Sequence, residues 1–340
     1  MLQTAVGPVP EVTSTLSWRD LWGHFLARWG VGRMHFTVDP GIYALGRPGQ
    51  DSPVLVTANY KMSFDRLRAS LPGKNAWILV LDTKGINVWC AAGKGTFGTR
   101  NLVHSIESMR LKELVSHRLI ILPQLGAPGV AAHLVSKSTG FKVIYGPIKA
   151  EDLPAFLDGH FHATPEMRKK TFTTWERAVL IPVEFVTALK WTLIVAPVFF
   201  LLGGMGGPEG FWATAMDSGL FAVYALFTAL AAGVIFTPLF LPWLPGRAFT
   251  LKGMCMGILC AGCLALYRGW RIEGWPDSLE ILGWFFLVPA LAGYFAMNFT
   301  GASTYTSLSG VRKEMKWAVP AEIGAGITGL VLWLGSRLLA

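Results

Sequence analysis

Charged residues are scarce in this 340-residue chain: they make up 15% of it, against roughly 25% in average soluble domains. There are only four cysteines, which excludes a disulfide scaffold, because such folds need many paired cysteines in a short chain. The N-terminus lacks a basic stretch followed by an apolar one, so no cleaved signal peptide is predicted. The mean hydropathy of +0.44 excludes a disordered chain and argues against an ordinary soluble enzyme.

The few charges are distributed unevenly. Residues 1–177 hold 21 Lys/Arg and 13 Asp/Glu, whereas residues 178–340 hold 9 and 8 together with nearly all the long apolar runs. We therefore predict a cytoplasmic first half and a lipid-embedded second half. The basic residues of the first half are scattered and form no stripe, which predicts contact with anionic lipid headgroups and no nucleic-acid partner.

Five apolar stretches approach the roughly 20 residues that a helix needs to cross a bilayer. They cover residues 185–203, 218–237, 253–267, 279–299 and 318–336. Lys and Arg are concentrated at the ends predicted to face inward, so we expect a multi-pass protein of the inner (cytoplasmic) membrane with a cytoplasmic N-terminal domain and an external C-terminus. The ionisable residues, Glu322 among them, lie near the predicted span ends, which favours an anchor or docking platform over a conduit.

Apolar runs typical of buried strands alternate with helical patterns between residues 51 and 165. Strands are predicted at 53–57, 76–82, 119–122 and 142–145, and helices at 64–71, 99–109, 130–139 and 150–157. This alternation predicts a Rossmann-like α/β domain with a mostly parallel sheet, whose ligand lies beyond the carboxyl ends of the strands. The other predicted parts are an N-terminal segment (1–50) with a surface helix over Leu16–Trp29, a linker (166–184) and an all-α transmembrane domain of five helices (185–340).

The longest loop at that edge, Thr83 to Gly98, contains Cys90 and allows several interpretations. The spacing of Gly93, Gly95 and Gly98 matches the Gly-x-Gly-x-x-Gly fingerprint of dinucleotide-binding proteins. In that fingerprint the first glycine directly follows a strand, whereas ten residues separate Gly93 from the preceding predicted strand. Cys90 could be an inert core residue or a nucleophile with His104 or His117 as its base. A single thiolate cannot hold zinc or a cluster, but it can serve as one axial ligand to a metal whose other positions a macrocycle fills.

The segment around this cysteine carries a resemblance. Asn87-Val88-Trp89-Cys90-Ala91-Ala92-Gly93-Lys94 resembles the cap-helix signature of the corrinoid proteins of microbial mercury methylation, the HgcA family. The surrounding α/β half, including Val54 to Tyr60, is similar to the corrinoid domain in the large subunit of the corrinoid iron–sulfur protein of acetyl-CoA synthesis. The five-helix second half also matches the HgcA layout, so the resemblance covers most of residues 50–340.

The resemblance implies a cofactor and a role for each residue of the signature. It implies cobalamin or a related corrinoid, with Cys90 as the catalytic residue and lower axial ligand of the cobalt. Asn87, Val88, Trp89, Ala91, Ala92, Gly93 and Lys94 would shape the cap helix that binds the cofactor, and Thr57, Asn59 and Tyr60 would contact the corrin. The implied activity is that of a membrane-anchored, cobalamin-dependent methyltransferase that passes a methyl group to Hg(II) and forms methylmercury.

The same resemblance implies three further partners: a folate-pathway methyl donor, thiol-bound Hg(II) as substrate, and a small ferredoxin-like protein with two 4Fe–4S clusters (HgcB) as electron donor. Two alternatives remain open: a corrinoid methyl carrier for a different acceptor, and a corrinoid-linked membrane transporter or sensor.

Two further motifs are interpreted as structural. Asp158-Gly-His160-Phe-His162 comes close to the Asp-x-His-x-x-Gly motif of other corrinoid enzymes, but it follows a predicted helix, so both histidines are interpreted as linker residues. Cys255, Cys260 and Cys263 have ferredoxin-like spacing but lie in one apolar helix, and we interpret them as small residues at a helix–helix contact.

Overall fold

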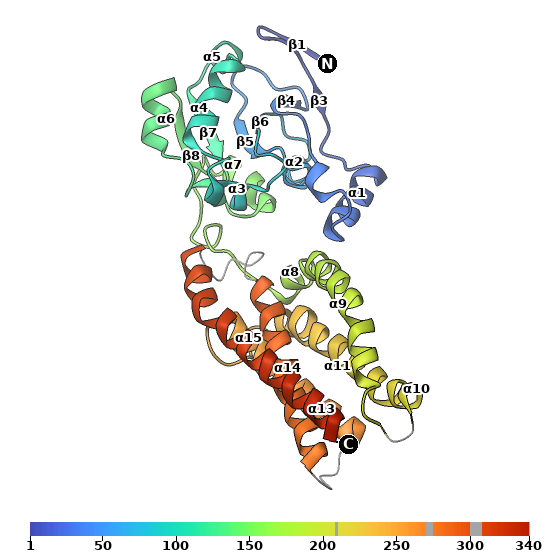
Figure 1. Ribbon diagram of the computed structural model, residues 1–340. Coiled ribbons are helices and arrows are strands. Elements are labelled where there is room, and N and C mark those ends of the chain that lie inside the picture. The colour runs from blue at the N-terminus through green and yellow to red at the C-terminus, as the bar shows by residue number, and fades with distance from the viewer. Residues whose placement is uncertain (208–209, 270–274, 300–307, 340) are drawn as a thin grey trace. The chain divides into compact units, whose positions relative to one another are not determined.

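The computed structural model describes residues 1–207, 210–269, 275–299 and 308–339, and it divides into two compact units (Figure 1). The first comprises Met1–Ala27 and Val31–Thr171, and the second comprises Arg28–Gly30 and Phe172–Ala340. The charge-rich and the apolar halves of the sequence thus form separate folding units.

The first unit is built on a six-stranded sheet with the order β3-β4-β6-β5-β7-β8. The strands are β3 (Glu11–Val12), β4 (Gly41–Leu45), β5 (Val54–Ala58), β6 (Ala76–Leu81), β7 (Leu119–Leu122) and β8 (Lys142–Tyr145). Strands β6, β5, β7 and β8 are parallel neighbours, and all four lie where the sequence predicted strands. The predicted mostly parallel α/β sheet is therefore confirmed.

The sheet extends into residues 1–50, which the sequence analysis had set apart from the α/β domain. Strand β4 pairs antiparallel with β6 along its whole length, from Gly41 opposite Val80 to Leu45 opposite Ala76. A strand of five residues carries too little periodic signal to be separated from the loops around it. The same segment also contains a small hairpin of β1 (Leu2–Thr4) and β2 (Gly7–Val9).

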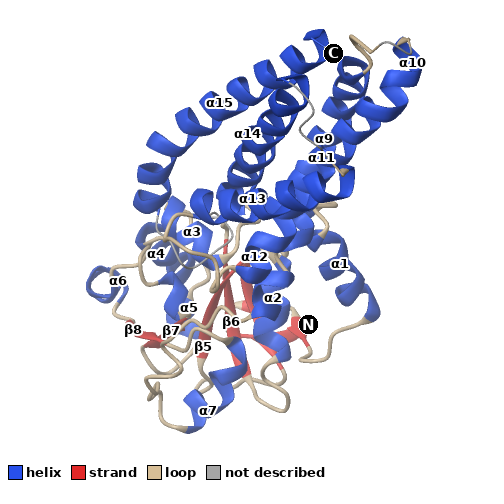
Figure 2. Cartoon of the chain, turned by 90° about the horizontal axis from the view of Figure 1, so that it is seen from below, coloured by secondary structure: helices blue, strands red, loops and turns tan. Residues whose placement is uncertain are grey.

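Helices cover both faces of this sheet (Figure 2). One core contains Val54 and Val56 of β5 with side chains of helices α3 to α6, and the other contains Leu55 with side chains of α2 and α7. The two cores use alternate residues of the same strand, as expected for a strand buried on both faces. The helices are α2 (Lys61–Ala69), α3 (Val88–Lys94), α4 (Thr99–Ser108), α5 (Leu111–Leu114), α6 (Ala132–Thr139) and α7 (Leu153–Asp158), and the short 3₁₀ turns are η1 (Arg33–His35), η2 (Gln124–Gly126) and η3 (Ala150–Asp152).

The predicted N-terminal helix is present as α1 (Trp18–Arg28), and its polar face docks on α2. The fully buried Asp65 carboxylate lies 2.9 Å from His24 Nε2, and it accepts hydrogen bonds from Lys61 (2.7 Å) and Arg68 (2.8 Å). Asp20 of α1 pairs with the same two cations, at 2.5 Å from Lys61 Nζ and 2.9 Å from Arg68 Nη2. Five charged or titratable groups thus hold α1 against α2.

The second unit is entirely helical and contains five helices that are long and apolar enough to span a membrane. They cover Thr174–Gly203, Phe211–Phe240, Phe249–Arg268, Trp275–Asn298 and Ser309–Leu339. Each overlaps one predicted span, which confirms the five-helix architecture. The elements are α8 (Thr174–Ala178), α9 (Ile181–Gly203), α10 (Phe211–Thr214), α11 (Leu220–Leu230), α12 (Thr237–Phe240), α13 (Phe249–Arg268), α14 (Trp275–Asn298) and α15 (Leu308–Leu339), with the π-helical turns η4 (Ala215–Gly219) and η5 (Ala231–Phe236) within the second span.

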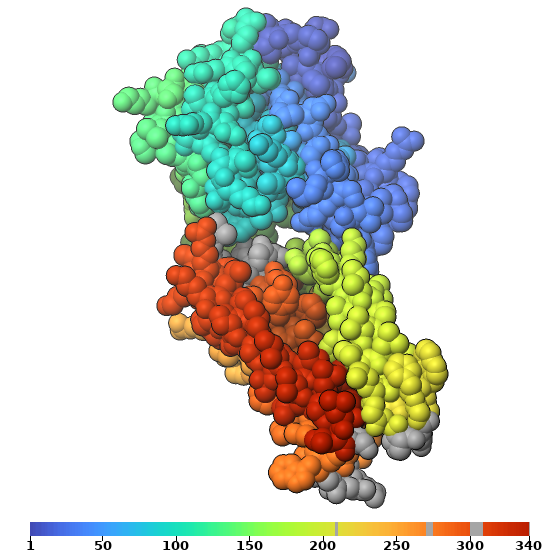
Figure 3. All heavy atoms as spheres, in the orientation of Figure 1, coloured from blue at the N-terminus to red at the C-terminus, as the bar shows by residue number. Residues whose placement is uncertain are grey.

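Small residues bring the helices of this unit close together. A Cβ added at Gly257 of α13 would lie 2.6 Å from Pro289 Cα of α14, and one added at Gly329 of α15 would lie 2.8 Å from the Gly283 carbonyl oxygen. Helix α15 also runs beside α9 (Figure 3), where the rings of Phe199 and Trp333 stack with centroids 5.3 Å apart.

The structure adds detail to two expectations about this unit. The buried face of α13 contains Gly253, Gly257 and Ala261, whereas Cys263 is exposed and Cys255 and Cys260 are half-buried beside that face. Cys263 therefore lies outside the helix contact, whereas Cys255 and Cys260 lie at its border. Glu322 lies well inside α15, which begins at Leu308, although it remains close to the start of the apolar span at residue 318. Its side chain is buried, and neither carboxylate oxygen has a hydrogen-bond partner within the described part of the chain.

Candidate functional site

The carboxyl ends of β5 and β6 are joined by the side chain of Asn59. Its Oδ1 accepts hydrogen bonds from the backbone N–H groups of Thr83 (3.1 Å) and Gly85 (3.0 Å), and it lies 2.8 Å from the Thr83 hydroxyl. Its Nδ2 reaches Asp82 at 3.4 Å. Asn59 was predicted as a corrin contact. The structure shows that it shapes the turn leading from β6 to Cys90.

The residues after this turn form the cap helix expected from the signature, as α3 (Val88–Lys94). Asn87 is its N-cap and accepts a hydrogen bond at 2.9 Å from the backbone N–H of Cys90. Asn is among the strongest N-cap residues because its side-chain oxygen satisfies a free amide of the first turn. Gly95 ends the helix with φ at 81°, a left-handed conformation that favours glycine. Cys90 is therefore held in the first turn of a short helix capped at both ends.

The small residues of the signature support the packing of α3 on its own chain. Ala91 and Ala92 are buried, and Ala92 packs against Gly129, where an added Cβ would lie 3.0 Å from Ala92 Cα. Likewise, an added Cβ at Gly126 would lie 2.6 Å from the Phe97 ring. Neither glycine was predicted from the sequence to be part of the site. The pattern Gly126-Ala-Pro-Gly129 directly after a strand could have indicated a close backbone approach at this point.

The predicted site residues thus fall into two groups. Trp89, Cys90, Gly93 and Lys94 are exposed or half-exposed, whereas Val88, Ala91 and Ala92 form the inner face of α3. Thr57, Asn59 and Tyr60 are buried where β5 ends. The Tyr60 ring packs edge-on against Phe36, and its buried hydroxyl has no hydrogen-bond partner among the described residues.

This donor set fits a corrinoid better than a protein-ligated metal ion. No group of three or more His, Cys, Asp or Glu residues gathers into a metal site in the described ranges. Zinc and iron–sulfur clusters need several such ligands, whereas a macrocycle leaves only an axial position for the protein. Cys90 can supply that one soft ligand.

The competing histidine motif lies at the opposite edge of the sheet. Lys74, which precedes β6, has its Nζ 2.5 Å from Asp158 Oδ1. Asp158 and the adjoining His160 are therefore near the amino ends of the strands, whereas Cys90 follows a carboxyl end. His117 is also at the amino edge, since its Nε2 lies 2.9 Å from the carbonyl oxygen of Ser52, just before β5. This placement separates His117, His160 and the Asp158 carboxylate from Cys90.

The glycines of the apparent dinucleotide fingerprint also have other roles. Gly93 lies within α3, Gly95 ends that helix, and Gly98 is the N-cap of α4. None of them forms the strand-to-helix turn that cradles a pyrophosphate, so the structure gives this interpretation no support.

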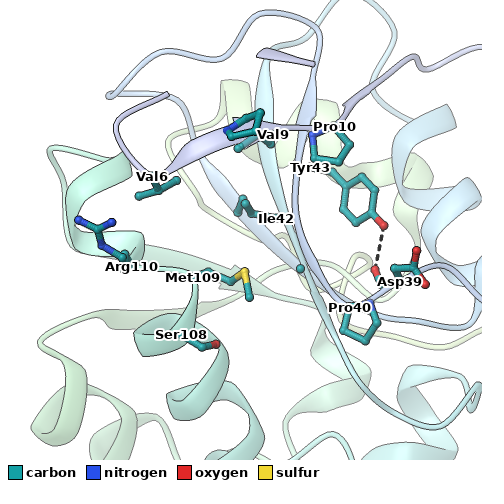
Figure 4. A pocket seen from close by; sticks show the side chains of 12 residues that line it. Val6, Val9, Pro10, Asp39, Pro40, Ile42, Tyr43, Ser108, Met109 and Arg110 are labelled. Atoms are coloured by element: carbon teal, nitrogen blue, oxygen red, sulfur yellow. Dashed lines mark hydrogen bonds between the residues drawn. The ribbon is translucent and has the colours of Figure 1, made fainter. Parts of the chain in front are cut away.

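A pocket of about 330 Å³ lies between the N-terminal hairpin, β4 and the end of α4 (Figure 4). Ile42, Met109 and Arg110 are among its lining residues, and no predicted site residue is. The Tyr43 hydroxyl, a polar group at its wall, donates a hydrogen bond to the Asp39 carbonyl at 2.8 Å. Few polar groups converge here, as a specific ligand site would require, and we do not assign the pocket a function.

The role of Asn59 can be tested by replacing it with Ala. The change leaves the buried N–H groups of Thr83 and Gly85 without their acceptor, at a cost of about 1–3 kcal/mol for each unsatisfied group. We expect amide hydrogen exchange to accelerate across Thr83–Gly98. Asn101→Ala is the matched control, since it removes a single hydrogen bond to Thr96 O at the far end of the loop, and the turn at Thr83–Gly85 should then keep its protection. Equal exchange in the two variants would contradict the role given to Asn59.

Comparison with known proteins relates the first unit to one family. The sequence model described as "CO dehydrogenase/acetyl-CoA synthase delta subunit" matches residues 31–157. Subunit gamma of the acetyl-CoA decarbonylase/synthase complex from Archaeoglobus fulgidus is 32% identical over 123 residues, covering 36% of this chain and 26% of that protein. Subunit gamma 2 from Methanosarcina thermophila is 31% identical over 133 residues, covering 37% and 27%.

The chain therefore spans about a quarter of the length of the curated relatives it matches. The N-terminal domain is distantly related to the delta and gamma subunits of CO dehydrogenase/acetyl-CoA synthase and acetyl-CoA decarbonylase/synthase complexes. The family match ends at residue 157, within the first unit.

Proposed function

We propose that this protein is a membrane-anchored corrinoid methyltransferase that transfers a methyl group to Hg(II) and forms methylmercury. The observation that carries the proposal is the placement of Cys90 in a capped helix beyond the carboxyl edge of a sheet, in a domain related to corrinoid subunits. Ligands of open α/β sheets bind at this edge.

The chain's own residues hold and orient the cofactor. The Cys90 thiolate would hold the cobalt of the corrinoid, and Asn87 fixes the helix turn from which the Cys90 side chain projects. The inner face of α3 prevents the sulfur from shifting, because Ala92 rests on backbone at Gly129. Trp89, Gly93 and Lys94 form the exposed surface around the sulfur.

When bound, a corrinoid would supply a methyl group for transfer to an electrophile, and the electron-donating Cys90 thiolate would favour that transfer. Thiol-bound Hg(II) is such an electrophile. The methyl group would come from the folate pathway. Residues 1–177 contain a single cysteine and so cannot hold a four-thiolate cluster. Low-potential electrons must therefore come from a partner, for which we propose a small two-cluster ferredoxin of the HgcB type.

The five helices of the second unit would anchor this chemistry at the cytoplasmic membrane, with the first unit in the cytoplasm. The Lys and Arg distribution in the short loops supports this orientation.

A product assay tests the proposed acceptor. The full-length protein in nanodiscs, loaded with methylated corrinoid, is supplied with thiol-bound Hg(II), and methylmercury is measured by mass spectrometry. We expect single-turnover methylmercury formation in proportion to the bound corrin absorbance. A corrinoid-loaded protein that yields no methylmercury would contradict the mercury assignment.

A second candidate is a corrinoid methyl carrier for a different acceptor. The relationship to subunits of an acetyl-CoA decarbonylase/synthase complex favours it. Parallel reactions with a metalloid, a thiol and Hg(II) distinguish the two candidates by which methylated product forms.

A further inference from the structure

The outward face of α1 is a stripe of large apolar side chains. We define the aromatic stripe as Trp18, Leu21, Trp22 and Phe25, with exposed fractions of 74%, 48%, 49% and 47%. The rings form a continuous surface, since Trp18 stacks on Trp22 at 6.3 Å and Trp22 on Phe25 at 5.2 Å between centroids. Contiguous exposed apolar surface of this kind marks an interaction site.

The polarity of α1 is reversed relative to an ordinary surface helix. Its polar side chains Asp20 and His24 point into the domain, where they meet Lys61, Arg68 and Asp65. A surface helix of a soluble domain normally buries its apolar side and exposes its charged side. The ionic network therefore holds α1 with its aromatic side outward.

The charges around the stripe favour an anionic occupant. Asp20 is the only acidic residue in α1, and Lys61 and Arg68 neutralise it. The exposed Arg19 adjoins the stripe, and residues 1–177 as a whole are strongly basic. Helix α1 also precedes the region matched by the corrinoid-subunit family, which begins at residue 31. The exposed aromatic side of α1 therefore lies outside the residues that match this family.

We propose that α1 is an interfacial helix, with the aromatic stripe buried in the headgroup region of an anionic bilayer. Trp side chains prefer this region, because their amphipathic rings match its gradient of polarity. Helices with an aromatic face flanked by Arg lie in the same plane. The five spans of the second unit would anchor the same chain in that bilayer. Because of this anchoring, even a weak contact between α1 and the membrane surface becomes effectively intramolecular.

Site-directed photocrosslinking of the full-length protein tests the proposal. Benzoylphenylalanine is introduced at Trp22 and, as the control, at Leu134, which is 45% exposed on α6. Both replace exposed apolar side chains, so an unchanged thermal midpoint is expected. After irradiation in nanodiscs of mixed phosphatidylcholine and phosphatidylglycerol, intact-protein mass spectrometry counts lipid adducts.

We expect lipid adducts at position 22 to exceed those at position 134 several-fold, and to decrease when phosphatidylglycerol is omitted. Equal yields at the two positions would overturn the proposal. So would crosslinks from position 22 to polypeptide, since these would identify the second unit or another protein as the occupant. The result is independent of methyl transfer, because no corrinoid or mercury is present.

Discussion

Replacing Cys90 with Ala is expected to abolish methyl transfer to Hg(II) while leaving the fold intact. The side chain is half-exposed in the first turn of α3, and Ala is compatible with that helix position. The change removes the proposed axial ligand itself. Its effect should therefore exceed the roughly 10–100-fold loss that follows removal of groups that only support a metal ligand. Methylmercury formation and the visible spectrum of the reconstituted protein measure the effect together.

The chain provides matched controls for this experiment. Cys255, Cys260 and Cys263 all lie on α13, in the second unit, and single Ala substitutions there should leave methyl transfer and spectrum unchanged. Cys90→His should retain part of the activity, because imidazole also coordinates cobalt, and its spectrum should differ from that of wild type. Normal methylation by Cys90→Ala would show that the thiolate is not the axial ligand. A colourless wild-type protein after reconstitution with cobalamin would contradict corrinoid binding altogether.

Replacing Asp65 with Asn should cause the largest loss of stability. Asp65 is fully buried between His24, Lys61 and Arg68, and the substitution leaves these groups facing a neutral amide. Removing one partner of a buried ion pair costs about 3–5 kcal/mol, and we expect a loss near the lower end of that range because Asp20 still faces Lys61 and Arg68. We expect a lower thermal midpoint for the first unit at pH 7. The contrasting variant is Asp158→Asn, which removes an exposed ion pair to Lys74 worth only about 0–1 kcal/mol.

The same network predicts how stability depends on pH. Burial by itself raises the pKa of Asp65, but the hydrogen bonds from His24, Lys61 and Arg68 outweigh it and hold that pKa below its usual value. The pKa of Asp20 is lowered as well, by Lys61 and by Ser17, against the opposing effect of burial. A lowered pKa in the folded state stabilises the protein above the ordinary carboxyl pKa of about 4, and this contribution is lost as the pH falls further.

The thermal midpoints of wild type and Asp65→Asn should therefore differ by a constant amount down to about pH 4 and converge as the pH decreases further. The variant has no carboxyl group to protonate at this position, so it lacks that part of the acid sensitivity. A difference between the two proteins that stays constant below about pH 4 would contradict the assigned role of the Asp65 charge.

The strands and spans could be predicted because their signals are local. Ala76–Leu81 is an uninterrupted apolar run, and the structure places it as the buried strand β6. The five membrane helices follow from hydropathy over windows of about 20 residues. Strand β4 was missed because five residues carry little periodicity, and its partner β6 lies more than thirty positions along the chain.

The signature around Cys90 could be recognised in the sequence, but the structural role of each residue in it could not be predicted from the sequence. Ala91 and Ala92 pack against their own chain because Gly126 and Gly129, more than thirty residues away, allow a close approach. Asn59 shapes the loop before α3 because two parallel strands end side by side.

Hydropathy and residue spacing are properties of residues that are neighbours in the chain. The sequence alone therefore determined the α/β half, the five membrane-spanning helices and the single cysteine of the first half. The three-dimensional fold placed His160 and His117 at the amino edge, away from that thiol, and turned the aromatic side of α1 outward. Both outcomes depend on contacts between residues distant in the chain, such as Lys74 with Asp158 and Asp20 with Arg68, which no local pattern encodes.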